Sequence, residues 1–136
     1  MHPVYLSQQA IQAFIQSSLL EDIGEGDHSS LGAIPRDKKT QGRLHIKDTG
    51  VVAGIELSKW IFKFVDPTLT TTYFVNDGEE IKPGDVAFVV EGNAHSILSA
   101  ERLILNCMQR MSGIATYTRK LSKLLSRLCR VRGCTR

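Results

Sequence analysis

One arginine in this sequence has a side chain that is able to bind an anion and stands in a distinctive helical run. Arg102 stands within residues 100–116, where apolar side chains recur at the spacing of an α-helix. The apolar positions at i, i+4 and i+8 are Leu103, Cys107 and Met111, broadened by Leu105 and Met108. The polar positions off the centre of that stripe are Glu101, Arg102, Gln109 and Arg110. A planar guanidinium there can hold a carboxylate through two parallel charge-assisted hydrogen bonds, so the run is typical of an anion-binding enzyme.

Arg102 also has a purely structural interpretation. Most helical arginines are solvated, and this one could form a surface i,i+3 ion pair or cap a helix. The helix that carries Arg102 is predicted to end at Ser112 and Gly113, because this pair is typical of helix ends.

The remaining polar residues favour structural roles. Asp27 and His28 are adjacent and do not face each other in regular structure, so Asp27 is expected to cap a turn. Glu21 and Asp22 stand at a predicted helix end. The other histidines are His2, His45 and His95, and their spacing is not that of metal ligands. The cysteines match neither a zinc ribbon nor a redox pair, so Cys107 is expected in the core and Cys129 and Cys134 as incidental thiols.

Helix and strand patterns alternate ahead of Arg102. A helix capped by Ser7 is predicted to bury Ile11, Phe14, Ile15 and Leu19 and to end at Gly24 and Gly26. Residues 42–48 alternate with period two, which predicts a strand with Leu44 and Ile46 inward and His45 outward. A second helix buries Leu57, Ile61, Phe64 and Val65 and closes at Asp66-Pro67. Residues 70–82 predict a β-hairpin around the turn Asn76-Asp77-Gly78, and residues 86–90 a buried strand.

Composition limits the classes of function. The chain has 136 residues, 42% hydrophobic and 23% charged, which indicates one folded, soluble domain of the cytoplasm. We expect no membrane span and no secretion signal, because no apolar run approaches about 18 residues and the N-terminus lacks a basic region with an apolar core. Residues 119–136 carry seven Lys or Arg and no acidic residue, but no aromatic side chain interleaves them to stack on bases. Nucleic acid is therefore not an expected partner.

Four segments, in order, resemble the N-terminal part of quinolinate phosphoribosyltransferase, also called nicotinate-nucleotide pyrophosphorylase (carboxylating). They are Leu20-Glu21-Asp22-Ile23-Gly24-Glu25-Gly26-Asp27-His28-Ser29-Ser30, Gly50-Val51-Val52-Ala53-Gly54 with Phe62-Lys63-Phe64-Val65-Asp66-Pro67, Asp77-Gly78-Glu79-Glu80-Ile81-Lys82-Pro83-Gly84-Asp85, and Ala100-Glu101-Arg102 with Ser112-Gly113-Ile114-Ala115-Thr116. Short Gly/Asp patterns occur by chance, but four in the right order identify the family.

The resemblance implies an α+β fold: the hammerhead-like α/β sandwich domain of a type II phosphoribosyltransferase, followed by only the start of its α/β barrel. It divides the chain into residues 1–112 and residues 113–136. The implied reaction joins quinolinate to phosphoribosyl pyrophosphate with Mg²⁺ and forms nicotinate mononucleotide, CO2 and pyrophosphate. In the family, the arginine that matches Arg102 grips a substrate carboxylate in the partner subunit of a homodimer.

The C-terminal end departs from the family pattern. Where the family has Asp-Thr-Arg-Lys-Thr, this chain has Cys134-Thr135-Arg136 and stops before the lysine. Arg136 is thus the second candidate substrate-binding residue. We expect the chain to be a fragment that is inactive alone.

Other functions stay open. One is a stand-alone structural or interaction domain of the same fold, and another is a related protein with a different substrate, such as a molybdenum-transport-associated or nicotinate phosphoribosyltransferase-like protein. Residues 77–85 also resemble lipoyl- and biotinyl-carrier domains, but no lysine here has the hairpin context of an attachment site.

Overall fold

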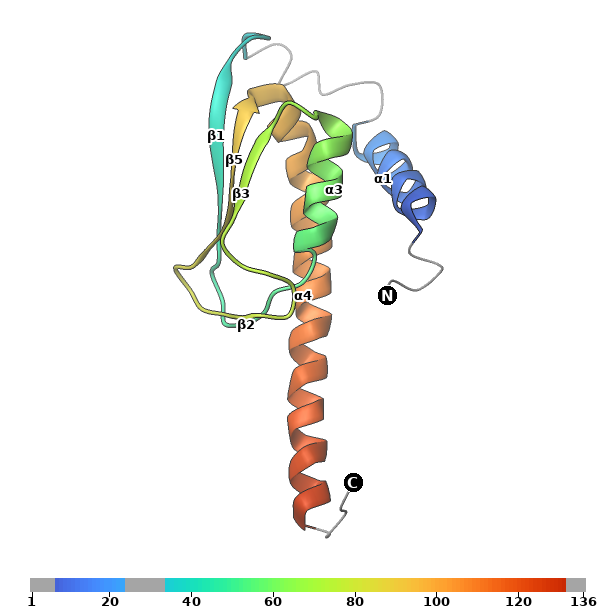
Figure 1. Ribbon diagram of the computed structural model, residues 1–136, viewed down its shortest axis with the longest axis vertical. Coiled ribbons are helices and arrows are strands. Elements are labelled where there is room, and N and C mark those ends of the chain that lie inside the picture. Colours follow the sequence, from blue (N-terminus) through green and yellow to red (C-terminus); the bar gives the residue numbers. More distant parts are fainter. Residues whose placement is uncertain (1–6, 24–33, 132–136) are drawn as a thin grey trace.

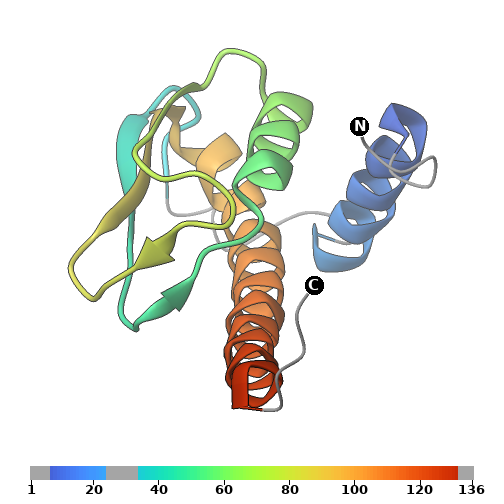
Figure 2. The same ribbon diagram turned by 60° about the horizontal axis from the view of Figure 1, so that its bottom comes forward.

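The computed structural model describes residues 7–23 and 34–131 and places them in three layers (Figure 1). The helices are α1 (Gln8–Ile23), α3 (Ile55–Val65) and α4 (Ala94–Val131). The strands are β1 (Lys39–His45), β2 (Gly50–Val51), β3 (Thr70–Tyr73), β4 (Glu80–Ile81) and β5 (Val86–Asn93). The turned view in Figure 2 shows a sheet on one side, α3 with the first half of α4 against it, and α1 on the far side of these helices.

The main sheet has three antiparallel strands in the order β1-β5-β3. Phe88 of the central strand stands opposite Leu44 on one side and Tyr73 on the other. The predicted alternation is confirmed, because Leu44 and Ile46 are half-buried and His45 is exposed. The strand itself begins and ends three residues earlier than the pattern of residues 42–48 indicates.

The predicted hairpin at residues 70–82 is wrong. β3 pairs with β5, and β4 pairs with β2 in a separate two-stranded sheet. The turn brings the chain back to residue 52 instead: the Gly78 N–H donates to the Val52 carbonyl at 2.8 Å, and the Val52 N–H donates to the Glu79 carbonyl at 3.0 Å. A strand pairs with whichever free edge satisfies its backbone groups, and here that edge belongs to β2.

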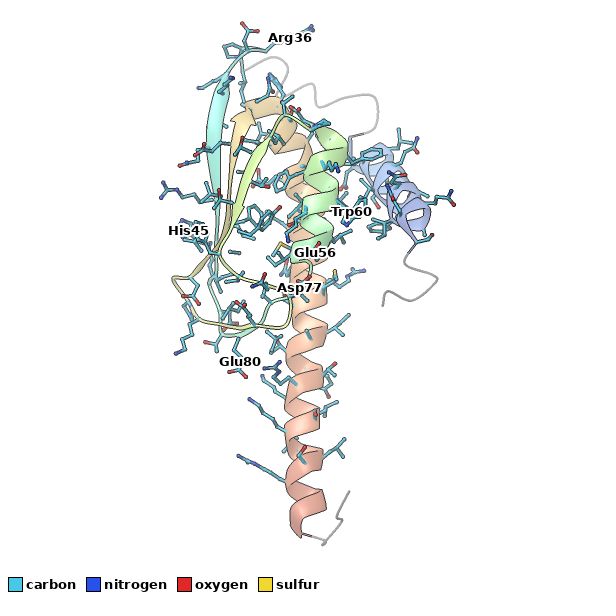
Figure 3. All side chains as sticks on the ribbon, viewed as in Figure 1. Arg36, His45, Glu56, Trp60, Asp77 and Glu80 are labelled. Carbon is cyan, nitrogen blue, oxygen red and sulfur yellow. The ribbon has the colours of Figure 1, made fainter. Side chains whose placement is uncertain are left out.

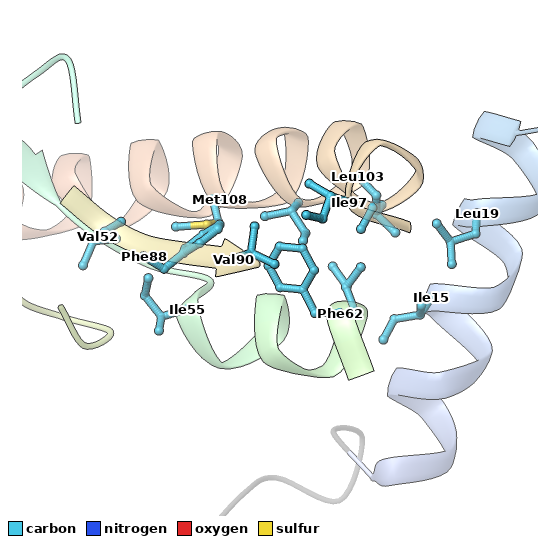
Figure 4. Close-up of a cluster of buried hydrophobic side chains, with 14 of the residues drawn as sticks. Ile15, Leu19, Val52, Ile55, Phe62, Phe88, Val90, Ile97, Leu103 and Met108 are labelled. Atoms are coloured by element: carbon cyan, nitrogen blue, oxygen red, sulfur yellow. The ribbon is translucent and has the colours of Figure 1, made fainter. Parts of the chain in front are cut away.

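The core lies between the sheet and the helices (Figure 4). Phe62 of α3 meets Phe88 of β5 edge to face, with ring centroids 5.5 Å apart. α1 adds Ile15 and Leu19, which are buried as predicted, whereas Phe14 is 46% exposed. Two side chains one turn apart are enough to join a short helix to the core, so the neighbouring Phe14 stays outside.

α4 is one continuous helix of 38 residues, so the predicted end at Ser112 and Gly113 is wrong. A glycine inside a helix costs only about 1 kcal/mol relative to alanine, and the Ser112 hydroxyl bonds residue 53 of another segment rather than breaking its own helix. The proposed boundary between residues 112 and 113 falls inside this helix and remains a prediction.

The buried side of α4 also differs from the predicted stripe. Its buried apolar residues are Ala94, Ile97, Ala100, Leu103, Ile104 and Met108. Leu105 and Met111 are each 39% exposed. The second half of α4 extends past the main sheet in Figure 1, and none of the described side chains in residues 109–127 is buried. No helix of the described residues is long and apolar enough to cross a bilayer.

Candidate functional site

The first turn of α4 is held firmly in the fold. The Asn93 Oδ1 accepts hydrogen bonds from the backbone N–H groups of His95 at 2.9 Å and Ser96 at 3.3 Å, and so caps the helix. The Asn93 Nδ2 donates to the Arg36 carbonyl at 2.7 Å, and His95 Nε2 lies 3.0 Å from the Ile34 carbonyl. His95 thus has a structural contact with a segment that lies 61 residues earlier in the chain.

Arg102 lies two turns further along α4, on its exposed side. Its side chain is 75% exposed. It lines a shallow depression of about 230 Å³, which we call the Arg102 hollow and which is formed by Leu98, Glu101, Arg102, Leu105 and Asn106. The hollow combines the apolar side chains of Leu98 and Leu105 with a guanidinium, an amide and the carboxylate of Glu101. Such a surface suits a flat, partly apolar anion better than a bare phosphate.

Asp22 on α1 approaches the Arg102 guanidinium. The Asp22 Oδ1 lies 3.8 Å from the Arg102 Nε, and the Asp22 side chain is only 26% exposed. The pair therefore joins two helices, and Arg102 forms neither the i,i+3 pair nor the helix cap of the structural interpretation. Ile15 and Leu19 fix α1 to the core, so Asp22 stands on a helix whose position is fixed.

The charge of Asp22 acts on the pKa of the nearby Cys107 thiol. Burial chiefly raises the pKa of the Cys107 thiol above 9.0, Arg110 opposes this rise, and Asp22 adds to it. A thiol with a raised pKa is almost fully protonated at neutral pH and is a poor nucleophile. Its position against the core agrees with the packing role predicted for Cys107.

The middle of α4 is bound to β2 and to the residues just after it by two side-chain hydroxyls. The Val51 N–H donates to the Thr116 Oγ1 at 2.9 Å, and the Ala53 N–H donates to the Ser112 Oγ at 2.9 Å. The Ser112 hydroxyl also donates to the Ala53 carbonyl at 3.2 Å. Ser112 and Thr116, two polar residues in the segment that resembles the family, are therefore structural groups that fix the direction of α4.

Asp77, which stands 22 residues further along the chain than Ile55, caps the start of α3. Its carboxylate accepts hydrogen bonds from the N–H groups of Ile55 at 2.8 Å and Glu56 at 3.1 Å. Figure 3 shows Asp77 and Glu56 close together at this helix end. Gly54, with φ of 104°, leads into α3, and a Cβ on it would stand 3.1 Å from the Met108 side chain. A side chain at residue 54 would thus be strained and would push α3 away from α4.

The exposed second half of α4 carries basic residues. Arg119 and Lys123 pair with the Glu80 carboxylate at 3.1 and 3.2 Å. Hydrogen bonds, first from Arg119 and then from Lys123, lower the pKa of the Glu80 carboxyl below its ordinary value. A second shallow hollow, of about 340 Å³, is lined by Lys120, Lys123, Leu124 and Arg127.

Several candidate residues lie outside the described part of the chain. They are His2, Asp27, His28, Cys134 and Arg136, together with the side chain of Cys129. The structure therefore places Arg102 but not Arg136. Within residues 7–23 and 34–131, no group of three or more His, Cys, Asp or Glu side chains is arranged to hold a metal ion.

Sequence reasoning missed the neighbours of Arg102. Asp22 is predicted only as a structural helix-end residue, and the contributions of Leu98 and Asn106 to a hollow are not predicted. The i,i+4 spacing of residues 98, 102 and 106 is a usable signal, since these positions share one side of a helix. No local signal links Asp22 to Arg102, because the two stand on different helices.

The sequence model of the family described as "Quinolinate phosphoribosyl transferase, N-terminal domain" matches residues 23–112. The chain belongs to this family. A family member from Nicotiana tabacum, "Quinolinate phosphoribosyltransferase [decarboxylating] 1b", is 43% identical over 122 residues, which are 89% of this chain and 34% of the relative. "Nicotinate-nucleotide pyrophosphorylase [carboxylating], chloroplastic" from Oryza sativa subsp. japonica is 43% identical over 129 residues, which are 94% of this chain and 34% of the relative.

Solved structures of family members share the fold. The nicotinate-nucleotide pyrophosphorylase from Francisella tularensis matches with a TM-score of 0.83 and 30% identity, covering 90% of this chain and 43% of that one. The enzyme of the same name from Ehrlichia chaffeensis matches with a TM-score of 0.78 and 26% identity, covering 87% and 42%. The α+β N-terminal domain fold is thus confirmed. The chain spans about a third of the length of the curated relatives that it matches.

Proposed function

We propose that this chain is the carboxylate-binding part of a quinolinate phosphoribosyltransferase, in which Arg102 contacts a carboxylate of quinolinate. The observation that carries the proposal is the position of Arg102: an exposed guanidinium beside an apolar-walled hollow on the outer side of α4. A planar aromatic dicarboxylate fits this combination, because its ring can lie on Leu98 or Leu105 while a carboxylate meets the guanidinium fork.

The proposed reaction is the one named for the relatives of this chain. The pyridine nitrogen of quinolinate attacks the anomeric carbon of phosphoribosyl pyrophosphate, and pyrophosphate leaves with the electron pair of the broken C–O bond. The bond from C2 to its carboxylate then breaks, CO2 leaves, and the electron pair left on C2 takes up a proton. Arg102 would bind and orient the dicarboxylate and offset the repulsion between its charges and the phosphates.

We also propose the partners and the location of the whole enzyme. We propose a homodimer in which Arg102 serves the active site of the other subunit, and phosphoribosyl pyrophosphate as the second substrate. We propose that Mg²⁺ takes part with phosphoribosyl pyrophosphate, whose phosphate oxygens are the ligands that this ion prefers. The cytoplasm stays our prediction for location, although the names of some relatives place them in mitochondria or chloroplasts.

The test is a chimera in which residues 20–118 of this chain replace the matching segment of the tobacco relative. We expect the chimera to form nicotinate mononucleotide, measured as CO2 released from carboxyl-labelled quinolinate. Arg102→Ala should lower kcat/KM by a factor that corresponds to roughly 1.5 to 3 kcal/mol, because a charged hydrogen-bond partner is lost. Arg102→Lys should restore only part of the lost kcat/KM, because a lysine ammonium cannot form two parallel hydrogen bonds with a carboxylate.

The matched control is Arg110→Ala, which removes another exposed arginine of α4 that does not line the Arg102 hollow. It should leave kcat/KM within about twofold. An active chimera in which Arg102→Ala and Arg110→Ala behave alike would overturn the assignment of Arg102.

A further inference from the structure

Asp22 contacts Arg102 at one edge of its guanidinium. The closest ion-pair contact joins Asp22 Oδ1 to Nε, the nitrogen that is attached to the side-chain stem. The two terminal nitrogens form the opposite end, which can bind a carboxylate through two parallel bonds. The Asp22 contact therefore leaves the binding end of Arg102 available.

We infer that Asp22 is a positioning residue for Arg102: its carboxylate holds the Nε edge of the guanidinium so that the terminal nitrogens are presented over the Arg102 hollow to an anionic substrate. This inference rests on the proposed function of Arg102. Asp22 belongs to the segment of residues 20–30 that resembles the family, and the sequence pattern of this segment predicts only a structural role for it.

The need for positioning follows from the exposure of Arg102. A long arginine side chain that is 75% exposed samples many rotamers, and ordering it on binding costs roughly 1.5 to 2 kcal/mol in lost side-chain freedom. A partner that restricts these rotamers before the substrate arrives removes part of that cost. Asp22 suits this role because its own side chain is only 26% exposed and α1 is fixed to the core.

Two other roles for Asp22 lead to different results. If the pair only stabilised the fold, Asp22→Asn would lower the unfolding midpoint and leave substrate binding unchanged. If Asp22 competed with the substrate for Arg102, Asp22→Asn would tighten substrate binding. Positioning predicts a more mobile guanidinium and weaker binding, at nearly constant stability, because exposed ion pairs contribute little to folding.

The first arm of the test uses this chain with Leu121→Lys and Leu125→Lys, two substitutions on the exposed part of α4 that should reduce self-association. The ¹⁵N–¹H heteronuclear NOE of the Arg102 Nε reports picosecond-to-nanosecond motion of the guanidinium, and Arg102→Lys identifies its signal by removing it. We expect Asp22→Asn to lower this NOE clearly. The matched control is Glu21→Gln, which removes the adjacent acidic residue of α1 and should leave the NOE unchanged. An unchanged NOE in Asp22→Asn would overturn the inference.

The second arm uses the chimera described above. Asp22→Asn should raise the KM for quinolinate roughly threefold to fivefold, the size that an exposed ion pair can supply, with kcat nearly unchanged. In an Arg102→Ala background the same substitution should have no further effect. An equal or lower KM in Asp22→Asn, with Arg102→Ala still impaired, would overturn the positioning role alone. Normal kinetics of Arg102→Ala would instead overturn the proposed function.

Discussion

Asp66 joins the end of α3 to the start of α4. Its Oδ1 accepts hydrogen bonds from the Thr68 hydroxyl at 2.6 Å and the Thr68 N–H at 2.9 Å, and its Oδ2 accepts one from the Ser96 hydroxyl at 2.8 Å. These bonds, led by that of the Thr68 hydroxyl, lower the pKa of the Asp66 carboxyl below its ordinary value of 3.8. One ionised side chain thus helps to orient the helix that carries Arg102.

The lowered pKa of Asp66 predicts a pH dependence of stability. A carboxyl whose folded pKa is depressed stabilises the native state above its unfolded pKa, and this contribution is lost as pH falls through the folded value. We therefore expect the free energy of unfolding to fall less steeply below about pH 4 in Asp66→Asn than in the wild type, as measured by urea denaturation at several pH values. Asp37→Asn, at an exposed turn before β1, should keep the wild-type slope. Parallel curves for wild type and Asp66→Asn would contradict the prediction.

Arg102 and Asp22 differ from Asp66 in what they contribute. Asp66 accepts three short hydrogen bonds, and the one from the Ser96 hydroxyl joins the end of α3 to α4. The Arg102 pair is long and largely exposed, so it adds little to stability. A charged residue that adds little to stability and faces a hollow is a better candidate for binding than for folding.

At the scale of elements, the direction of α4 depends on its contact with β2. The close approach requires glycine at residue 50, because a Cβ there would stand 2.6 Å from the Thr116 Oγ1. The Thr116 hydroxyl in turn satisfies the Val51 N–H. Threonine and glycine are thus complementary parts of one contact between a helix and an extended segment.

Removing the Thr116 hydroxyl should weaken the fold. Thr116→Val keeps the shape of the side chain and leaves the part-buried Val51 N–H without its acceptor, which costs about 1 kcal/mol or more. The midpoint of urea denaturation should fall without a change in slope. The control is Thr118→Val, because the Thr118 hydroxyl bonds only the Ile114 carbonyl of its own helix. Equal midpoints for the two variants would show that the Thr116 contact adds nothing to stability.

At the scale of the whole molecule, α4 exposes a row of apolar side chains beyond the core. The exposed fractions are 64% for Ile114, 64% for Tyr117, 44% for Leu121, 55% for Leu124 and 65% for Leu125. Their spacing of three and four residues places them along one side of the helix. A row of exposed apolar side chains of this kind favours self-association.

We therefore expect the isolated chain to self-associate at micromolar concentration. Sedimentation velocity should show species larger than the monomer, and the double variant Leu121→Lys with Leu125→Lys should shift them towards the monomer. Leu20→Lys is the control, since Leu20 is also 65% exposed but stands on α1. A clean monomer that binds no apolar dye would contradict the prediction. Leu103 does not belong to this exposed row, because it is buried in the core.

The sequence by itself determines the local elements of this protein. The period-two alternation at Leu44 and Ile46, the inward side of α1 at Ile15 and Leu19, and the end of α3 at Asp66 all follow from residues within a few positions of each other. The family and the choice of Arg102 as a candidate also follow from motifs in the sequence. Such features are readable because backbone geometry and side-chain direction are local properties.

Only the tertiary structure decides which distant segments meet. The pairing of β4 with β2, the capping of α3 by Asp77 and the contact of Asp22 with Arg102 each depend on which donors and acceptors remain free after the core has formed. The continuation of α4 through Gly113 has the same origin, since Ser112 and Thr116 bond another segment on either side of it. Long-range complementarity of this kind leaves no periodic signal in the chain, because it is a relation between surfaces and not between neighbouring residues.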